Sequence, residues 1–335
     1  MQFNTVSTLT SNQASTELFS GVLSDPVNLF LWTGLGLALT GLIVSSGLKN
    51  GIERAVTFLM PLLFALLLAM VGYAAYAGDF HQGVVFLFSP DFSKITPEVV
   101  LVAIGQAFFS VSVAMAGMMT YGAYLPKEVS IGRSVSIVVF ADVLVALLAG
   151  LAIFPLVFQH GFDPQGGPGL IFETLPMAFA QMPGGAFFST LFFLLLAVAA
   201  ITSMVGLLEP LVSWAVEQKG FKRRDAGLMF VGIVLVLSQL SIFSYNTLED
   251  FSPLNAIPGF AGKNLNDILG FITDQIMLPV GGLLIALFAG WVMRDSSTRD
   301  ELALGNPLVY KLWRFLIRYI VPVAVFLVLV LGITE

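Results

Sequence analysis

The sequence predicts an all-α integral membrane protein, on the evidence of its composition and the length of its apolar segments. The chain has 335 residues, of which 57% are hydrophobic and only 11% are charged. A soluble domain carries about 25% charged residues on average. The apolar residues lie in runs long enough for helices of about 20 residues, which cross the hydrocarbon core of a bilayer. Helices also satisfy their own backbone hydrogen bonds in lipid, whereas membrane β-barrels show short segments of alternating polarity.

We expect eight helical spans, joined by loops of which one, residues 159–186, stands out. This loop is rich in Gly and Pro and contains the apolar segment LIFETLPMAFA. The segment is too short to cross a bilayer and predicts a re-entrant or capping hairpin. The expected spans are approximately 27–47, 54–77, 98–124, 131–158, 187–217, 225–245, 270–293 and 310–333.

The distribution of basic residues orients these spans. If the loops alternate between the two sides, one side receives all 15 Lys and Arg residues except Lys94 and Lys263. Since basic loops stay in the cytoplasm, residues 1–25 and Glu335 are expected outside the cell, in a plasma-membrane protein. An N-terminus outside arises either from translocation of a tail of uncharged and acidic residues or from an odd number of spans missing in front. Residues 1–25 contain no Lys or Arg, so they do not resemble a signal peptide.

Several functional classes are excluded by what the sequence lacks. The absence of cysteine excludes disulfides, cysteine-ligated metals and thiol chemistry. The net charge of −6, without a basic block, gives no expectation of a nucleic-acid partner. An intramembrane aspartyl enzyme needs two carboxylates that share one site, and Asp142 and Asp274 lack the characteristic flanking residues. No HExxH metal motif is present, so the chain is not expected to be an enzyme.

Three carboxylates fall inside the expected spans, namely Asp142, Glu209 and Asp274. An ionisable group at membrane depth is costly and suggests function. No Lys or Arg is expected at membrane depth to pair with them, so each must be protonated, hydrogen-bonded or close to a cation. A bound Na⁺ or H⁺ would supply that cation. The alternative is a carboxylate held by backbone or hydroxyl donors for packing alone.

Two segments of small and hydroxyl residues suggest where ions and substrate bind. The stretch 110–117 in the third span has few strong helix formers, and such a segment unwinds where it lines a cavity. The stretch 199–203 ends in adjacent Thr202 and Ser203, whose hydroxyls are hard oxygen ligands of the kind that suits Na⁺. Ordinary helix packing also uses small residues, so both segments have a purely structural alternative.

Seven segments, in order, resemble the neurotransmitter:sodium symporter family, in particular its prokaryotic amino-acid transporters. They are GIERAVTFLMPLLF, VAIGQAFFSVSVAMAGMMTYGAYLPK, DVLVALLAGLAIFP, GPGLIFETLPMAF, GGAFFSTLFFLLLAVAAITS, LLEPLVSWAVE and MLPVGGLLIALFAGW. The resemblance covers residues 27–333 and begins at the family's fourth span. It implies a leucine-transporter-like inverted-repeat bundle that is N-terminally incomplete, with one broken helix at 98–124. Residues 1–26 then resemble the remnant of an extracellular loop, and 27–335 form the transporter domain.

The resemblance also implies roles for individual residues. The first sodium site matches Ser110 and Asp142. The second sodium site matches Ala199, Thr202 and Ser203. The substrate pocket matches Phe109, Ser110, Ser112, Met115, Ser203 and Leu207, with Phe109 as an aromatic lid. A chloride or charge position matches Gln106 and Asp142. The cytoplasmic gate matches Tyr124 and Glu217. The position of the outer-gate aspartate falls on Gly270, with the candidates Asp267 and Asp274 each about one turn away. Ala114 and Ala116 depart from the family, since they replace glycines often found at the helix break.

The function implied is Na⁺-driven symport of a neutral amino acid by alternating access, with Na⁺ as the coupling ion and chloride dependence left open. Membrane lipid and a small neutral amino acid are the expected partners. Because half of each sodium site has no counterpart in this sequence, the chain alone is expected to be inactive unless a second chain supplies three N-terminal spans. The alternative is a non-functional remnant of a degraded transporter gene.

Overall fold

The computed structural model of the chain describes residues 12–126, 128–164, 167–257 and 259–334, and every element in these ranges is a helix. Seven of these helices are long and apolar enough to cross a bilayer. They are Pro26–Ser45, Leu48–Ala77, Ile131–Gln159, Gly185–Lys219, Arg223–Phe243, Leu265–Val292 and Pro307–Ile333. Each coincides with one of the eight expected spans, so the all-α membrane architecture is confirmed.

The eighth expected span, 98–124, is the broken helix. It consists of α6 (Pro97–Ser110) and α7 (Gly117–Ala123), separated by the six residues 111–116. The loop 159–186 contains a short π-helical turn, η3 (Leu170–Thr174), followed by α10 (Leu175–Ala180). The broken helix agrees with the expectation from the sequence, whereas the re-entrant or capping role of the loop stays a prediction.

The chain forms two compact units, each described by itself. Unit 1 comprises the chain up to Pro90 and Leu144–Thr247, and unit 2 comprises Asp91–Val143 and the chain from Leu248. Helix α8 (Ile131–Gln159) contributes to both units. Unit 1 also contains α2 (Asn12–Leu23), α3 (Pro26–Ser45), η1 (Leu48–Glu53), α4 (Arg54–Ala77), α5 (Phe80–Phe88), α9 (Gly167–Gly169), η3, α10, α11 (Gly185–Lys219) and α12 (Arg223–Phe243).

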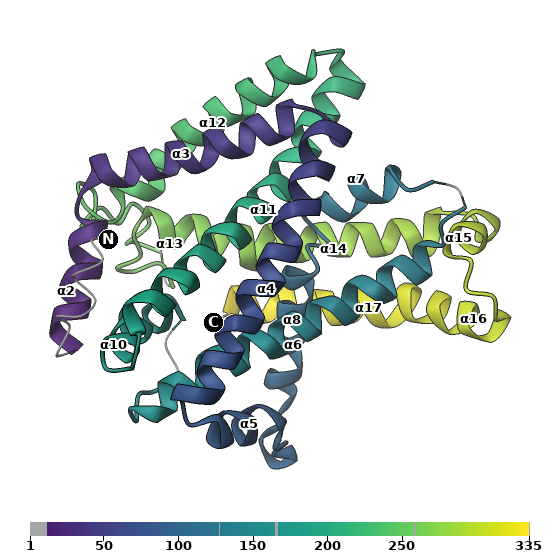
Figure 1. Cartoon of the computed structure of the whole chain (residues 1–335). Helices are drawn as coiled ribbons and strands as arrows, with labels where there is room; N and C mark the ends of the chain where they lie inside the picture. Colours follow the sequence, from purple (N-terminus) through teal and green to yellow (C-terminus); the bar gives the residue numbers. More distant parts are fainter. Residues whose placement is uncertain (1–11, 127, 165–166, 258, 335) are drawn as a thin grey trace. The chain divides into compact units, whose positions relative to one another are not determined.

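Close helix packing organises unit 1. Helices α3 and α12 run side by side (Figure 1), and Gly41 is essential to this approach. A Cβ atom at Gly41 would lie 2.7 Å from Cγ2 of Val231, closer than real Cβ contacts come. A hydrophobic core of unit 1 lies where α4, α8 and α11 meet α10, around the buried side chains of Tyr73, Leu156 and Phe179.

The N-terminal helix α2 packs on the loop hairpin. Thr16 Oγ1 donates a hydrogen bond to Glu173 Oε2 at 2.7 Å. The rings of Phe19 and Phe172 stack with their centroids 5.4 Å apart. Residues 1–11 of the expected loop remnant lie outside the described residues, and the extracellular position of 12–23 stays a prediction.

Unit 2 is built around the close packing of α6, α14 and α17. Its elements are η2 (Phe92–Lys94), α6, α7, α13 (Leu265–Gly270), η4 (Phe271–Met277), α14 (Leu278–Leu287), η5 (Phe288–Val292), α15 (Asp295–Leu302), α16 (Pro307–Phe315), η6 (Leu316–Ile320) and α17 (Val321–Thr334). Elements α13 to η5 are continuous and form the seventh expected span, while α16 to α17 form the eighth.

Two arginines cap the C-terminal end of the Leu265–Val292 helix by hydrogen bonds to its last carbonyls. Arg314 donates to the carbonyls of Ala289 at 3.0 Å and Met293 at 2.9 Å. Arg318 Nε donates to the carbonyl of Gly290 at 2.6 Å. The last carbonyls of a helix have no partner within it and carry partial negative charge, so cationic donors stabilise this end.

Candidate functional ion and substrate site

The helix break at 111–116 is the most irregular stretch of backbone within the expected spans. Ser112 and Ala116 adopt φ values of +53° and +60°, in the left-handed region. The amide of Val113 donates to the carbonyl of Phe108 at 3.3 Å, and that of Ser112 donates to Phe109 at 3.1 Å. These bonds replace the regular helical pattern, so the chain turns away from the helix axis just after Ser110.

The two residues assigned to the first sodium site lie in direct contact in unit 2. Ser110 is the last residue of α6, and its Oγ donates a hydrogen bond to Oδ2 of Asp142 at 2.6 Å. Asp142 stands on α8 and is half-buried. A carboxylate and a hydroxyl at the end of a helix form a set of hard oxygen donors that suits an alkali cation. The structure therefore brings together Ser110 and Asp142, which are 32 residues apart in sequence and lie on two different helices.

The residues of the second predicted sodium site lie along α11 in unit 1. Thr202 Oγ1 donates to the carbonyl of Ala199 at 2.8 Å. Two of the three predicted ligand oxygens, those of Ala199 and Thr202, therefore lie next to each other. Ser203 is exposed one position further on. Since residues four apart lie on the same face of a helix, Ala199, Ser203 and Leu207 form one stripe. Leu207 is exposed, whereas Val205 and Leu208 point into the core of unit 1.

The predicted substrate residues divide between the two units. Phe109, Ser110, Ser112 and Met115 lie at the end of α6 and in the break of unit 2, while Ser203 and Leu207 lie on α11 of unit 1. Within unit 2 they are contiguous in sequence and share the irregular backbone. Their role in binding substrate stays a prediction.

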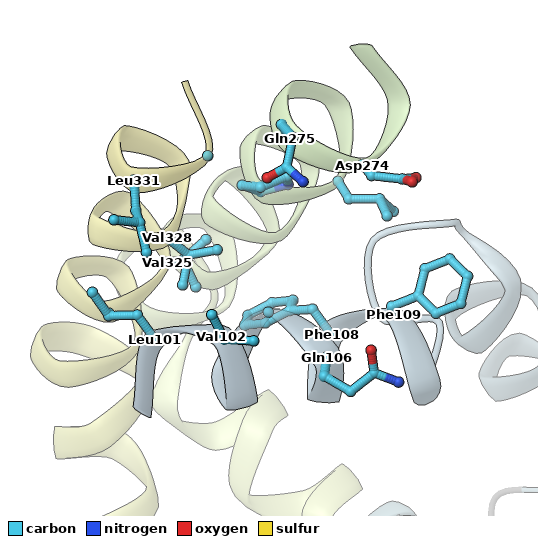
Figure 2. A pocket seen from close by; sticks show the side chains of 14 residues that line it. Leu101, Val102, Gln106, Phe108, Phe109, Asp274, Gln275, Val325, Val328 and Leu331 are labelled. Carbon is cyan, nitrogen blue, oxygen red and sulfur yellow. The ribbon is translucent and has the colours of Figure 1, made fainter. Parts of the chain in front are cut away.

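A cavity of about 370 Å³ opens in unit 2 beside the end of α6. Gln106, Phe109 and Asp274, all singled out in the sequence, lie on its wall (Figure 2). The aliphatic remainder of its lining includes Leu101, Val102, Val325, Val328 and Leu331, from α6 and α17. No sequence signal identified the residues of α17, because they are ordinary membrane aliphatics.

The gate candidates differ in what their side chains do. Asp267 accepts from the amide of Asn264 at 3.3 Å in a capping box that begins α13, so its carboxylate already serves the helix. Asp274 accepts from Thr273 Oγ1 at 3.1 Å and faces the cavity. Asp274 is therefore the better placed of the two for an outer gate. Glu217 accepts from Ser213 Oγ at 3.0 Å, and Tyr124 contacts the ring of Tyr121 edge-on.

One expectation about charge is wrong. Glu209 does have a basic partner, because Arg223, at the first turn of α12, forms an ion pair with it. The Glu209 side chain is fully buried, and Arg223 Nε also donates to the carbonyl of Val44 at 2.8 Å. The sequence placed Arg223 in a loop, but the long arginine side chain carries its charge from the end of one helix into the core. Glu209 is thus a paired structural carboxylate in this structure.

A broken apolar helix with carboxylate and hydroxyl groups at its break, among membrane-spanning helices, defines the class of ion-coupled membrane transporters. The family model of the sodium:neurotransmitter symporter family matches residues 26–251. The chain belongs to this family of sodium-dependent transporters, so the enzyme alternative has no support.

Individual relatives agree with this assignment. An uncharacterised sodium-dependent transporter of Bacillus subtilis is 35% identical over 93% of this chain and 68% of the relative. An uncharacterised sodium-dependent transporter of Haemophilus influenzae is 29% identical over 92% of this chain and 66% of the relative. The crystal structure of MhsT in complex with L-phenylalanine matches with a TM-score of 0.83 and 37% identity, over 94% of this chain and 70% of MhsT. The chain thus spans about two thirds of the length of these proteins.

Proposed function

We propose that this chain carries part of the ion and substrate sites of a Na⁺-coupled symporter for neutral amino acids. The observation that carries the proposal is the contact between Ser110 and Asp142 at the helix break. A carboxylate at membrane depth is stable when a cation neutralises it, and Asp142 has a hydroxyl ligand beside it. The binding of L-phenylalanine by the similar protein MhsT supports an amino-acid substrate.

The proposed mechanism uses differential affinity. Na⁺ at the break and a substrate in the adjacent pocket would each bind one conformation more tightly than the other, and this difference shifts the population between outward- and inward-facing states. No bond is made or broken, so no residue acts as a catalyst. The apolar Met115 among the predicted pocket residues of unit 2 favours an apolar substrate side chain, and no Lys or Arg lies among the predicted pocket residues to hold an acidic one.

The 335-residue polypeptide by itself is expected to show no uptake. Dehydrated Na⁺ needs several oxygen ligands, and the matched first site provides only Ser110 and Asp142. If the polypeptide acts without further spans attached, a second chain must provide the remaining ligands. Gln106 matches a position near the family's chloride site, whereas an anionic Asp142 would make chloride unnecessary. Replacing chloride with gluconate in the uptake assay described next distinguishes the two.

The experiment is sodium-driven uptake into vesicles by the chain preceded by the first three spans of a family member such as MhsT. We expect accumulation of at least one radiolabelled neutral amino acid that depends on an inward Na⁺ gradient. Asp142→Ala should weaken this dependence strongly, because the ion loses a full countercharge, whereas Asp142→Asn keeps an oxygen ligand and should be milder. An unchanged sodium dependence in Asp142→Ala would remove the assignment of the first site.

A further inference from the structure

Two adjacent glycines, Gly281 and Gly282, lie in the interior of helix α14, in unit 2. Glycine destabilises a helix interior relative to alanine. Its presence twice in succession therefore calls for a close approach that a side chain would prevent. Both glycines face the broken helix: Gly282 meets Phe108 just before the break, and Gly281 meets Ala114 within it.

The approach at Gly282 involves an aromatic ring. A Cβ atom built there would lie 2.6 Å from Cε1 and 3.1 Å from Cδ1 of Phe108. Contacts below 3.0 Å are essentially absent from real proteins, so the ring would have to move. Phe108 is on the last turn of α6, directly before Phe109 and two residues before Ser110.

The approach at Gly281 involves backbone. A Cβ atom there would lie 3.3 Å from the carbonyl oxygen of Ala114 and 3.4 Å from its Cβ. Ala114 lies inside the break, between the left-handed residues Ser112 and Ala116. Phe108 and Ala114 are linked through Val113, whose amide donates to the Phe108 carbonyl at 3.3 Å. The two glycines thus contact the two ends of the segment 108–114, which is held together by this hydrogen bond.

We propose that Gly281 and Gly282 form a shelf, the glycine shelf, that positions the break and thereby the ligand atoms of Ser110 and the ring of Phe109. The shelf residues touch neither ion nor substrate and act as positioning residues. Metal–ligand distances tolerate changes of only about 0.2 Å. A methyl group on the shelf displaces Phe108 by several tenths of an ångström or more. The ligand atoms of Ser110 would then shift as well, and the affinity for Na⁺ would fall.

The inference rests on the proposed transport function for its consequence, but the position of the break can be measured independently. The chain has no cysteine, so Ser112→Cys introduces a single reactive thiol within the break. We would compare its rate of modification by a small thiol reagent in the 335-residue chain with and without Gly282→Ala. The matched control is Gly232→Ala in α12, where an added Cβ meets nothing within 4 Å.

We expect Gly282→Ala to change the modification rate by about threefold or more, and Gly232→Ala to leave it unchanged. Adding Phe108→Leu to Gly282→Ala should restore the original rate, because the clashing ring atom is removed. In the uptake assay, Gly282→Ala should raise the Na⁺ concentration for half-maximal uptake about tenfold, as loss of a group that orients a metal ligand does.

Equal modification rates in Gly282→Ala and Gly232→Ala would overturn the glycine shelf, whether or not the chain transports. A sodium response that is unchanged in Gly282→Ala, with only a loss of thermal stability, would also overturn it, since the glycines would then serve helix packing alone. Absence of sodium-driven uptake in the unsubstituted protein counts against the proposed function instead, and the thiol rates then decide the shelf by themselves.

Discussion

Arg223 at the start of α12 reaches the fully buried carboxylate of Glu209 on α11, and the same guanidinium donates to the carbonyl of Val44 on α3. One side chain therefore ties together three helices of unit 1. The pair lies next to Pro210, inside α11. The energetic consequence follows from burial. Removal of Arg223 leaves the fully buried carboxylate of Glu209 without its countercharge, which costs far more than the loss of a surface ion pair.

We predict that Arg223→Ala lowers the free energy of unfolding of the detergent-solubilised chain by about 3–5 kcal/mol. The exposed neighbour Arg224 is the matched control, and Arg224→Ala should change stability by less than about 0.5 kcal/mol. Thermal unfolding measures both. The double substitution Glu209→Leu and Arg223→Leu should recover most of the loss, because an apolar pair needs no countercharge. Equal effects of Arg223→Ala and Arg224→Ala would mean that the ion pair contributes nothing.

Backbone strain at Ala116 leads to a second prediction. Its φ of +60° is left-handed, a conformation that costs a residue with a Cβ atom roughly 1–2 kcal/mol. Ala116→Gly relieves this strain but adds freedom to the unfolded chain, which costs about 0.4–1 kcal/mol. The net result should be a stabilisation of up to about 1 kcal/mol in thermal unfolding.

The control for Ala116→Gly is Ala114→Gly, two residues earlier in the same break. Ala114 does not share the positive φ of Ser112 and Ala116. Substitution by glycine there gives no strain relief and should destabilise by about 0.5–1 kcal/mol. The prediction is therefore a difference in sign between two identical chemical changes, and two effects of the same sign would contradict it.

Much of this arrangement could be predicted from the sequence, and the reasons are physical. A bilayer offers the backbone no hydrogen-bond partners and so favours helices, which made the eight spans readable from apolar length alone. The break at 111–116 was predicted from the resemblance to the family, because small and hydroxyl residues alone also serve ordinary helix packing. The pairing of Glu209 with Arg223 could not be predicted from the sequence, because it depends on how far an arginine side chain reaches from a helix end. The aliphatic cavity wall at Val325 and Val328 could not be predicted either, because such residues occur throughout the spans and only packing distinguishes them.

His160 carries the third prediction, on pH. It lies just beyond the end of α8, where its Nε2 is buried and, among the described residues, has no hydrogen-bond partner. Burial lowers the pKa of His160 below its usual value of 6.5, because the charged form is poorly solvated. Above pH 6.5 the imidazole is neutral in both folded and unfolded states and has no effect. As pH falls below 6.5 the unfolded state binds the proton first, so stability decreases.

The measurement is the unfolding midpoint between pH 7.5 and 5.5, compared between the original chain and His160→Gln. The loss of stability on acidification should be smaller in His160→Gln, because glutamine does not titrate. His81, in α5, is the second histidine of the chain, and His81→Gln provides the matched control. A pH profile that is identical with and without His160 would refute the prediction.

The last prediction concerns which side of the membrane each loop faces. All Lys and Arg residues except Lys94 and Lys263 fall on one side of the expected topology, and basic loops stay in the cytoplasm. Gly262 lies in the loop before α13, and Gly220 lies in the short turn between α11 and α12. Both have positive φ and open space around them, so each turn is accessible to a reagent.

Because the chain has no cysteine, Gly262→Cys and Gly220→Cys each introduce one reporter. We expect an impermeant thiol reagent added to intact cells to label Gly262→Cys and to leave Gly220→Cys unmodified until the cells are opened. Both variants are compared after permeabilisation, so that strain from the positive φ is not mistaken for inaccessibility. Labelling of Gly220→Cys from outside intact cells would reverse the orientation. It would also place the cytoplasmic gate residues Tyr124 and Glu217 on the outer side, and the assignment of gates to sides would then fail with it.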